Sequence, residues 1–126
     1  MKKNLSTVQA PKAIGPYSQA VIVNNFLYIS GQIPIDPKTQ KVVTQDIESQ
    51  TRQVMRNLQA ILLEAGIDFE NVIKTSIFIK NMDHFPIINR IYSEYFKAGN
   101  YPARETVEVA RLPKDVKIEI SLIAHK

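Results

Sequence analysis

The sequence predicts an α+β fold in which two helices cover one face of a mixed sheet. Several short segments show the two-residue alternation of apolar and polar side chains that is typical of half-buried strands. Two longer segments show the three- and four-residue spacing of amphipathic helices, and the predicted order is strand, strand, helix, strand, helix, strand, strand. With 126 residues and 44% hydrophobic content, we expect one domain over residues 1–126.

The amino-terminal part is expected to be an irregular arm followed by a β-hairpin. The first 16 residues are rich in proline and glycine, which leaves room for at most a short strand. Apolar runs at 19–23 and 26–30 flank Asn24-Asn25, and asparagine tolerates the positive φ angles of a tight hairpin turn.

A first helix is predicted between Asp46 and Gly66, after a proline-containing loop at residues 33–43. Its apolar residues recur at helical spacing, and charged and amide side chains occupy the remaining positions. Asp46 is expected to cap the start of this helix, and Gly66 to follow its end.

Residues 72–80 predict a strand whose apolar face includes Ile73 and Ile77. A second helix is expected to be capped by Asp83 and to end at Gly99. We interpret its apolar stripe as core, not as a surface for stacking bases. The stripe consists of Phe85, Ile88, Tyr92, Tyr95 and Phe96.

The carboxyl-terminal part reads as two strands with a tight connection. Residues 104–110 and 116–124 alternate, and a turn that contains proline and aspartate separates them. Alternation places Glu119 on the polar face of the second run. In the first run Val107 is expected on the apolar side and Arg104 on the polar one, so Arg104 and Glu119 are expected to share one sheet surface.

Charge and composition argue against several classes of protein. The net charge is +4, but the sixteen basic residues are scattered, so nucleic-acid binding is not predicted. The chain has no cysteine, and its two histidines lack metal-ligand spacing, so no metal site is expected. No apolar run approaches the ~20 residues of a membrane span, and no signal-peptide core is present, so we expect a cytoplasmic protein without membrane contact.

Two helices leave the other face of the sheet uncovered. That face would carry serine, threonine, lysine and glutamate beside valine and phenylalanine, too apolar for water and too polar for a core. We therefore expect a closed homo-oligomer packed through its sheet faces, with polar groups at the clefts between subunits.

Three blocks of sequence carry a family resemblance. They read AIGPYSQA at 13–20, ISGQIP at 29–34, and PAR at 102–104 with VEVARLPKDVKIEI at 107–120. Together they resemble the RidA branch of the YjgF/YER057c/UK114 family over essentially the whole chain. The resemblance implies a chorismate-mutase-like α+β fold and a homotrimer whose sheets line a central barrel, with a ligand cleft between each pair of subunits.

The resemblance also implies an activity. It is the hydrolysis of enamines and imines, such as 2-aminoacrylate and its 2-iminopropanoate tautomer, to a 2-oxoacid and ammonia, without a cofactor. A protonated imine carbon is already electrophilic, so the chief task is to position a water molecule. Two alternatives stay open: a regulatory module that binds a 2-oxoacid without turnover, and an RNA-acting translation inhibitor or endoribonuclease, which the scattered charge disfavours.

Site residues follow by matching the family's motifs. Arg104 matches the arginine that binds the substrate carboxylate, and Glu119 matches the acid that activates water. The other matched ligand-binding positions are Tyr17, Ser30, Gly31, Thr106 and Asn89.

Three positions depart from the pattern of the family. Thr106 replaces a familiar cysteine, Glu105 adds a carboxylate beside Arg104, and Ser121 stands where a second glutamate is common. Strand alternation predicts that Glu105 points to the face opposite Arg104.

Overall fold

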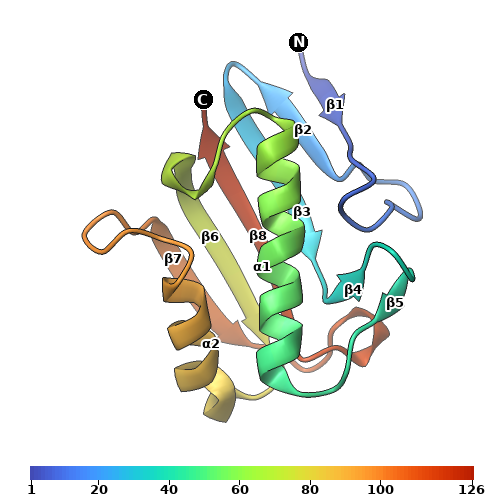
Figure 1. Cartoon of the computed structure of the whole chain (residues 1–126), viewed down its shortest axis with the longest axis vertical. Coiled ribbons are helices and arrows are strands. Elements are labelled where there is room, and N and C mark those ends of the chain that lie inside the picture. The colour runs from blue at the N-terminus through green and yellow to red at the C-terminus, as the bar shows by residue number, and fades with distance from the viewer.

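A computed structural model describes all 126 residues and shows a six-stranded sheet, two α-helices and a separate two-stranded ribbon (Figure 1). The strands are β1 (Lys3–Leu5), β2 (Ala20–Val23), β3 (Phe26–Gln32), β4 (Ile35–Asp36), β5 (Lys41–Val42), β6 (Val72–Ile79), β7 (Ala103–Glu108) and β8 (Ile118–His125); the helices are α1 (Ile47–Glu64) and α2 (Phe85–Ser93). The order in the large sheet is β1-β2-β3-β8-β6-β7. Only β6 and β7 are parallel, so the sheet is mixed.

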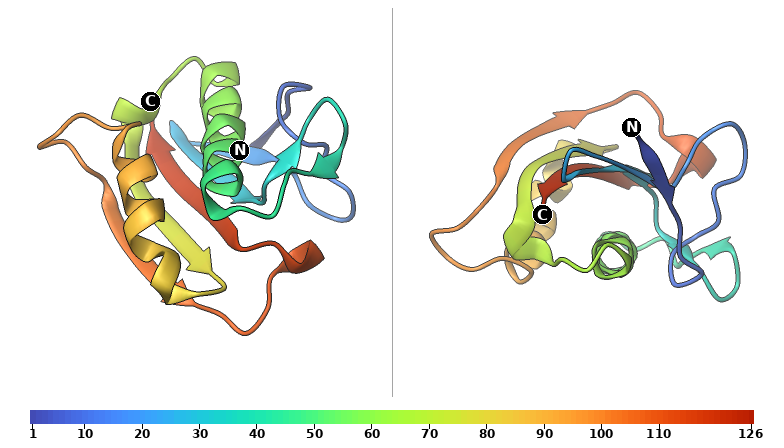
Figure 2. Two further views of the ribbon diagram at one scale, coloured as in Figure 1. Left: turned by 60° about the horizontal axis from the view of Figure 1, so that its bottom comes forward. Right: turned by 90° about the horizontal axis from the view of Figure 1, so that it is seen from above.

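Both helices lie on the same side of the sheet (Figures 1 and 2). Helix α1 packs on β3 and β8, and α2 packs beside α1. A cluster of 21 buried residues fills the space between the helices and the sheet, and Leu58, Ile77 and Ile120 are fully buried in it. The predicted α+β class is confirmed. No helix combines the length and the apolar character needed to cross a lipid bilayer.

The β2–β3 hairpin forms at the predicted turn. Asn24 and Asn25 have φ angles of 49° and 67°, the positive values that a two-residue hairpin turn requires. The predicted loop at 33–43 contains β4 and β5, which are only two residues long each.

Helix α1 begins and ends where its sequence predicts. The Asp46 side chain accepts a hydrogen bond from the Ser49 backbone N–H at 2.8 Å. At the other end Gly66 has φ +78°, and the Ile67 N–H donates to the Leu62 carbonyl at 3.1 Å. This is the Schellman arrangement, which satisfies carbonyl groups that the helix leaves free.

The Asp46 cap makes helix stability depend on pH. Hydrogen bonds from Thr44 and then Ser49 lower the pKa of Asp46 from 3.8 to about 2. A carboxyl group with a lowered pKa stabilises the folded state fully above its ordinary pKa, and this contribution is lost as pH falls through about 2.

We therefore expect Asp46→Ala to lower the melting temperature at pH 7, and the difference from wild type to shrink between pH 3.8 and about 2. Asp46→Asn still caps the helix and serves as the control in thermal denaturation. An Asp46→Ala chain that melts with wild type at pH 7 would contradict this role.

Helix α2 begins close to its predicted start but ends earlier than predicted. A 3₁₀ helix, Met82–His84, precedes it, and the Asn81 side chain caps this 3₁₀ helix by accepting from the Asp83 N–H at 2.9 Å. Helix α2 itself has no side-chain cap, so the predicted Asp83 cap is wrong. The helix ends at Ser93, well before Gly99. After Ser93 the backbone N–H groups of Glu94, Tyr95 and Phe96 bond to carbonyls three residues back instead of four. The rings of Tyr95 and Phe96 pack against Phe69, which precedes β6.

Strand β6 departs from simple alternation at its start. Val72 is buried and Ile73 is 44% exposed, the reverse of the prediction. The pairing of β6 with β8 shifts register between Val72 and Lys74, and a β-bulge of this kind turns the following side chains to the other face.

Strands β7 and β8 do not form the predicted hairpin, because β6 lies between them. β7 pairs with β6 in parallel and forms the edge of the sheet, whereas β8 pairs antiparallel with both β6 and β3. The expected inward position of Val107 is also wrong, since this side chain is 41% exposed. An edge strand that is exposed along most of its length carries little hydrophobic pattern from which its orientation could be read.

Candidate functional site

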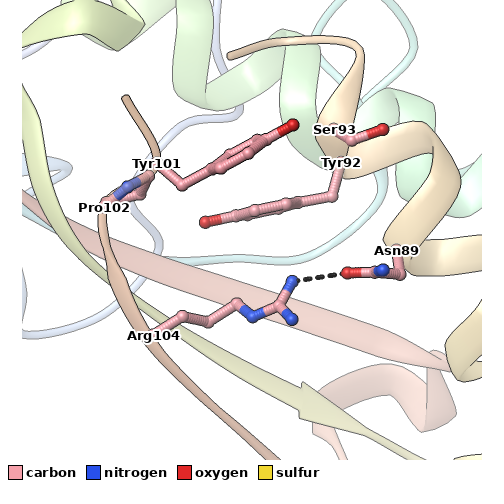
Figure 3. A pocket seen from close by; sticks show the side chains of 6 residues that line it. All are labelled: Asn89, Tyr92, Ser93, Tyr101, Pro102 and Arg104. Atoms are coloured by element: carbon pink, nitrogen blue, oxygen red, sulfur yellow. Dashed lines mark hydrogen bonds between the residues drawn. The ribbon is translucent and has the colours of Figure 1, made fainter. Parts of the chain in front are cut away.

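The side chain of Arg104 extends from β7 toward α2, at the rim of a cavity (Figure 3). Its Nη1 donates a hydrogen bond to Asn89 Oδ1 at 2.7 Å. The guanidinium carbon lies 5.3 Å from the ring centroid of Phe85 and 5.1 Å from that of Tyr92. The cavity measures about 370 Å³ and is lined by Asn89, Tyr92, Ser93, Tyr101, Pro102 and Arg104.

No carboxylate neutralises Arg104. None of the six ion pairs of the chain includes it, and the side chain is exposed. A planar guanidinium with free N–H groups at the rim of a cavity is suited to bind a carboxylate with two parallel hydrogen bonds. Arg104 is therefore a candidate for binding an anionic ligand between β7 and α2.

Glu119 lies in a second cavity of about 370 Å³, together with Tyr17 and Gly31. Burial raises the pKa of the Glu119 carboxyl above its ordinary value of 4.5, and no neighbouring charge offsets that effect. A carboxylate with a raised pKa is a stronger base than an exposed one. No three histidine, aspartate or glutamate side chains gather in a group that could hold a metal ion.

Gly31 makes space for the Glu119 side chain. A Cβ atom at this position would clash with the Glu119 carboxylate. The family resemblance gives Gly31 as a ligand-binding position, but within the chain the space beside its Cα is occupied by the Glu119 side chain. Gly31 and the Glu119 side chain therefore pack directly against each other in the second cavity.

Arg104 and Glu119 lie on opposite faces of the sheet, contrary to the prediction of a shared surface. On β6, Arg104 pairs with Thr75, which is buried beneath the helices. Glu119 pairs with Phe78, three residues further along the same strand. Paired residues share a face and successive residues alternate, so Thr75 and Phe78 face opposite sides. The prediction failed because it assumed a hairpin between β7 and β8.

Two other matched residues line neither cavity. The Ser30 hydroxyl donates to the Ser18 carbonyl at 2.6 Å, so this side chain ties the segment around Tyr17 to β3. The Thr106 hydroxyl is buried without a hydrogen-bond partner, two residues along β7 from Arg104.

Glu105 points away from the Arg104 cavity, as strand alternation predicts. It pairs with Lys74 at 3.0 Å and accepts a hydrogen bond from the Ser76 hydroxyl on the open face of the sheet. The extra carboxylate therefore forms no ion pair with Arg104.

Sequence reasoning missed three aromatic residues that contact Arg104 or line its cavity: Phe85, Tyr92 and Tyr101. Phe85 and Tyr92 were interpreted as core, and Tyr101 was not singled out. The spacing of Phe85, Asn89 and Tyr92 could have revealed the connection, because residues separated by four and then three positions share one helix face. Tyr92 belongs to the core and also contacts Arg104.

Comparison with known proteins places the chain in a family. Residues 7–126 match the family described as Endoribonuclease L-PSP. A RutC family protein of Pyrococcus horikoshii is 55% identical over 126 residues, which cover 100% of this chain and 99% of that protein. The 2-iminobutanoate/2-iminopropanoate deaminase of Salmonella typhimurium is 47% identical, with 98% of each chain covered.

Comparison with solved structures places the chain in the same family. The crystal structure of a conserved Rid family protein from Yersinia pestis matches with a TM-score of 0.98 and 51% identity, over 100% of both chains. The resemblance inferred from the three sequence blocks is confirmed. The chain therefore belongs to the Endoribonuclease L-PSP family, which includes the YjgF, RutC and UK114 proteins.

Proposed function

We propose that the protein hydrolyses 2-imino acids and their enamine tautomers, such as 2-aminoacrylate, to a 2-oxoacid and ammonia. The observation that carries this proposal is a pair of unengaged groups: a guanidinium without a carboxylate partner and a carboxylate of raised pKa, each beside a cavity. A carboxylate-bearing imine needs one group of each kind. The likeness to a deaminase of this type supports the assignment.

In the proposed reaction Arg104 holds the substrate carboxylate. Glu119 takes a proton from a water molecule while the oxygen of that water forms a bond to the iminium carbon of the substrate. The resulting carbinolamine receives that proton from Glu119 on its nitrogen. The C–N bond then breaks, ammonia leaves with the bonding electron pair, and the hydroxyl loses its proton as the carbonyl forms. Every proton transfer can pass through one carboxyl group.

Because the two groups lie on opposite sheet faces, one chain cannot apply both to a small ligand. We infer a closed homo-oligomer, a homotrimer by family resemblance, in which Arg104 of one copy completes the Glu119 cavity of the next. The open sheet face supports this, since it carries exposed Tyr28 and Val107 beside the polar Ser76 and Ser121.

The proposed function is tested by supplying 2-aminoacrylate from a pyridoxal-phosphate-dependent dehydratase and following the loss of the intermediate and the release of ammonia. We expect the wild-type protein to accelerate hydrolysis well beyond the spontaneous rate. A protein that binds pyruvate but leaves the rate unchanged would be a 2-oxoacid-binding regulatory module instead.

A shared cleft predicts that two inactive variants complement each other. Arg104→Ala and Glu119→Gln, unfolded together and refolded as a mixture, should regain activity in about a quarter of the clefts of a randomly mixed closed ring. The two variants refolded separately and then combined without exchange are the control. Absence of any recovery in truly mixed oligomers would show that the cleft is not shared.

Gly31→Ala is expected to lower kcat by at least about tenfold, part of the ~10²- to 10⁴-fold that a positioned general base contributes, because the methyl group displaces the Glu119 carboxylate. KM should change little, since Arg104 is untouched. Ser121→Ala, which adds no atoms near Glu119, is the matched control. Wild-type kcat in the Gly31 variant would argue against the role of Glu119.

An RNA-acting role is the second candidate, because the family carries the description Endoribonuclease L-PSP. Five of the sixteen lysines and arginines form ion pairs with acids, as in Arg52 with Glu94 and Lys97 with Glu70. The basic residues are scattered along the sequence without a cluster, which disfavours this candidate. RNA binding that falls steeply with salt concentration would favour this candidate.

A further inference from the structure

Three residues of one face of α2 hold the guanidinium of Arg104. Phe85 and Tyr92 are seven residues apart, about two helical turns or ~10.5 Å. The guanidinium carbon lies 5.3 Å from the centroid of the Phe85 ring and 5.1 Å from that of the Tyr92 ring, so it contacts both rings. Asn89, on the turn between them, accepts a hydrogen bond from Nη1 at 2.7 Å.

This arrangement leaves one edge of the guanidinium open. Asn89 engages Nη1, which lies on the side of Cδ, whereas Nε and Nη2 make no hydrogen bond within the chain. The N–H groups of Nε and Nη2 lie side by side and can bind both oxygens of a carboxylate. The free edge is therefore the Nε and Nη2 edge.

Tyr92 is itself fixed by Thr75. The Tyr92 hydroxyl and the Thr75 hydroxyl lie 2.8 Å apart in a hydrogen bond, with only 3% and 1% of the two residues exposed. Thr75 is also the residue of β6 that pairs with Arg104 of β7. Arg104, Thr75 and Tyr92 therefore contact one another in turn. The strand pairing links Arg104 to Thr75, a hydrogen bond between hydroxyl groups links Thr75 to Tyr92, and the Tyr92 ring contacts the guanidinium of Arg104.

We propose that Thr75 and Tyr92 are positioning residues, which together with Phe85 and Asn89 present the Nε and Nη2 edge of Arg104 to the ligand carboxylate. The proposal deepens the proposed function and rests on it for the identity of the ligand. A free arginine samples many rotamers, and a guanidinium held in place loses less conformational freedom when it binds. Asn89 thus acts through Arg104 and need not touch the ligand.

The first test does not depend on activity. ¹⁵N relaxation of the Arg104 Nε–H group, assigned by its loss in Arg104→Lys, reports how rigid the guanidinium is. We expect this group to be as ordered as the backbone in wild type, and mobile in Tyr92→Leu and in Thr75→Val. Thr75→Ser, which keeps the hydroxyl, should restore order. The exposed Arg56, which takes part in no ion pair, is the internal reference for an unrestrained side chain.

If Thr75→Val or Tyr92→Leu fails to fold, Tyr92→Phe decides the question, since it keeps the ring and removes only the hydroxyl bond. Here we expect intermediate mobility of the Arg104 Nε–H group. An Arg104 side chain as mobile as Arg56 in wild type, or one unaffected in every folded variant, overturns the proposal.

The second test separates positioning from mere stability. In the coupled assay, Tyr92→Leu should raise KM about tenfold, within the range of a lost cation–π contact and its ordering, and change kcat by less than about threefold. Thr75→Val should raise KM less, and its effect should not add to that of Tyr92→Phe. Variants with lower melting temperature but wild-type KM would show a structural role only, which overturns the proposal. If wild type releases no ammonia, the proposed function fails, and the Nε relaxation still decides the positioning.

Discussion

Arg104→Ala is expected to lower kcat/KM for 2-aminoacrylate by about 10²- to 10⁴-fold, because the variant loses two hydrogen bonds to the charged carboxylate of the substrate. Most of this loss should appear as a higher KM, because the carboxylate is bound equally before and during the reaction. The fold should persist, since Arg104 is exposed and takes part in no ion pair.

Two further variants sharpen this test. Arg104→Lys keeps the charge but loses the planar fork, so its activity should fall between those of wild type and Arg104→Ala. Arg90→Ala removes a different exposed arginine, which lies on α2 and forms an ion pair with Glu48 at 3.9 Å. This variant should behave as wild type. An unchanged rate in Arg104→Ala, with the oligomer intact, would refute the assigned site.

Glu119→Gln is expected to lower kcat by about 10²- to 10⁴-fold and also to stabilise the protein at neutral pH. Burial raises the pKa of Glu119 above 4.5, so the folded state binds this proton more tightly than the unfolded chain does. The contribution of Glu119 to stability is therefore fully present below 4.5 and is lost as pH rises through the folded-state pKa. Glutamine carries no charge and escapes this loss.

Melting curves of wild type and Glu119→Gln should thus coincide below pH 4.5 and separate toward pH 7, with the variant more stable. Glu105→Gln is a control that should change the stability at pH 7 in the opposite direction, because hydrogen bonds from Ser76 and Lys74 lower the pKa of Glu105. That variant should be less stable than wild type at pH 7. A Glu119→Gln protein that is active, or that loses stability at pH 7, would remove Glu119 from the proposed role.

Features that depend on neighbouring residues could be predicted from the sequence. Asp46 and Gly66 delimit α1 because a cap and a left-handed residue act through local hydrogen bonds. Asn24-Asn25 closes the β2–β3 hairpin for a similarly local reason. The start of α2 was less predictable, since the chain enters it through a 3₁₀ helix capped by Asn81 and the predicted Asp83 cap does not form.

The candidate site was predictable in its residue types but not in its arrangement. Motif matching identified Arg104 and Glu119, but it could not show that Tyr92 and Phe85 hold the guanidinium. An apolar stripe on a helix has the same pattern whether it meets only core or also a charged side chain.

By itself, then, the sequence determined the family, the α+β class and the two groups proposed for the chemistry. Only the tertiary structure decided that β6 separates β7 from β8, and hence that Arg104 and Glu119 occupy opposite faces. The physical reason is that pairing between strands is a non-local choice. Alternation along β7 or β8 defines two faces, but the neighbour in the sheet decides which of those faces meets the helices.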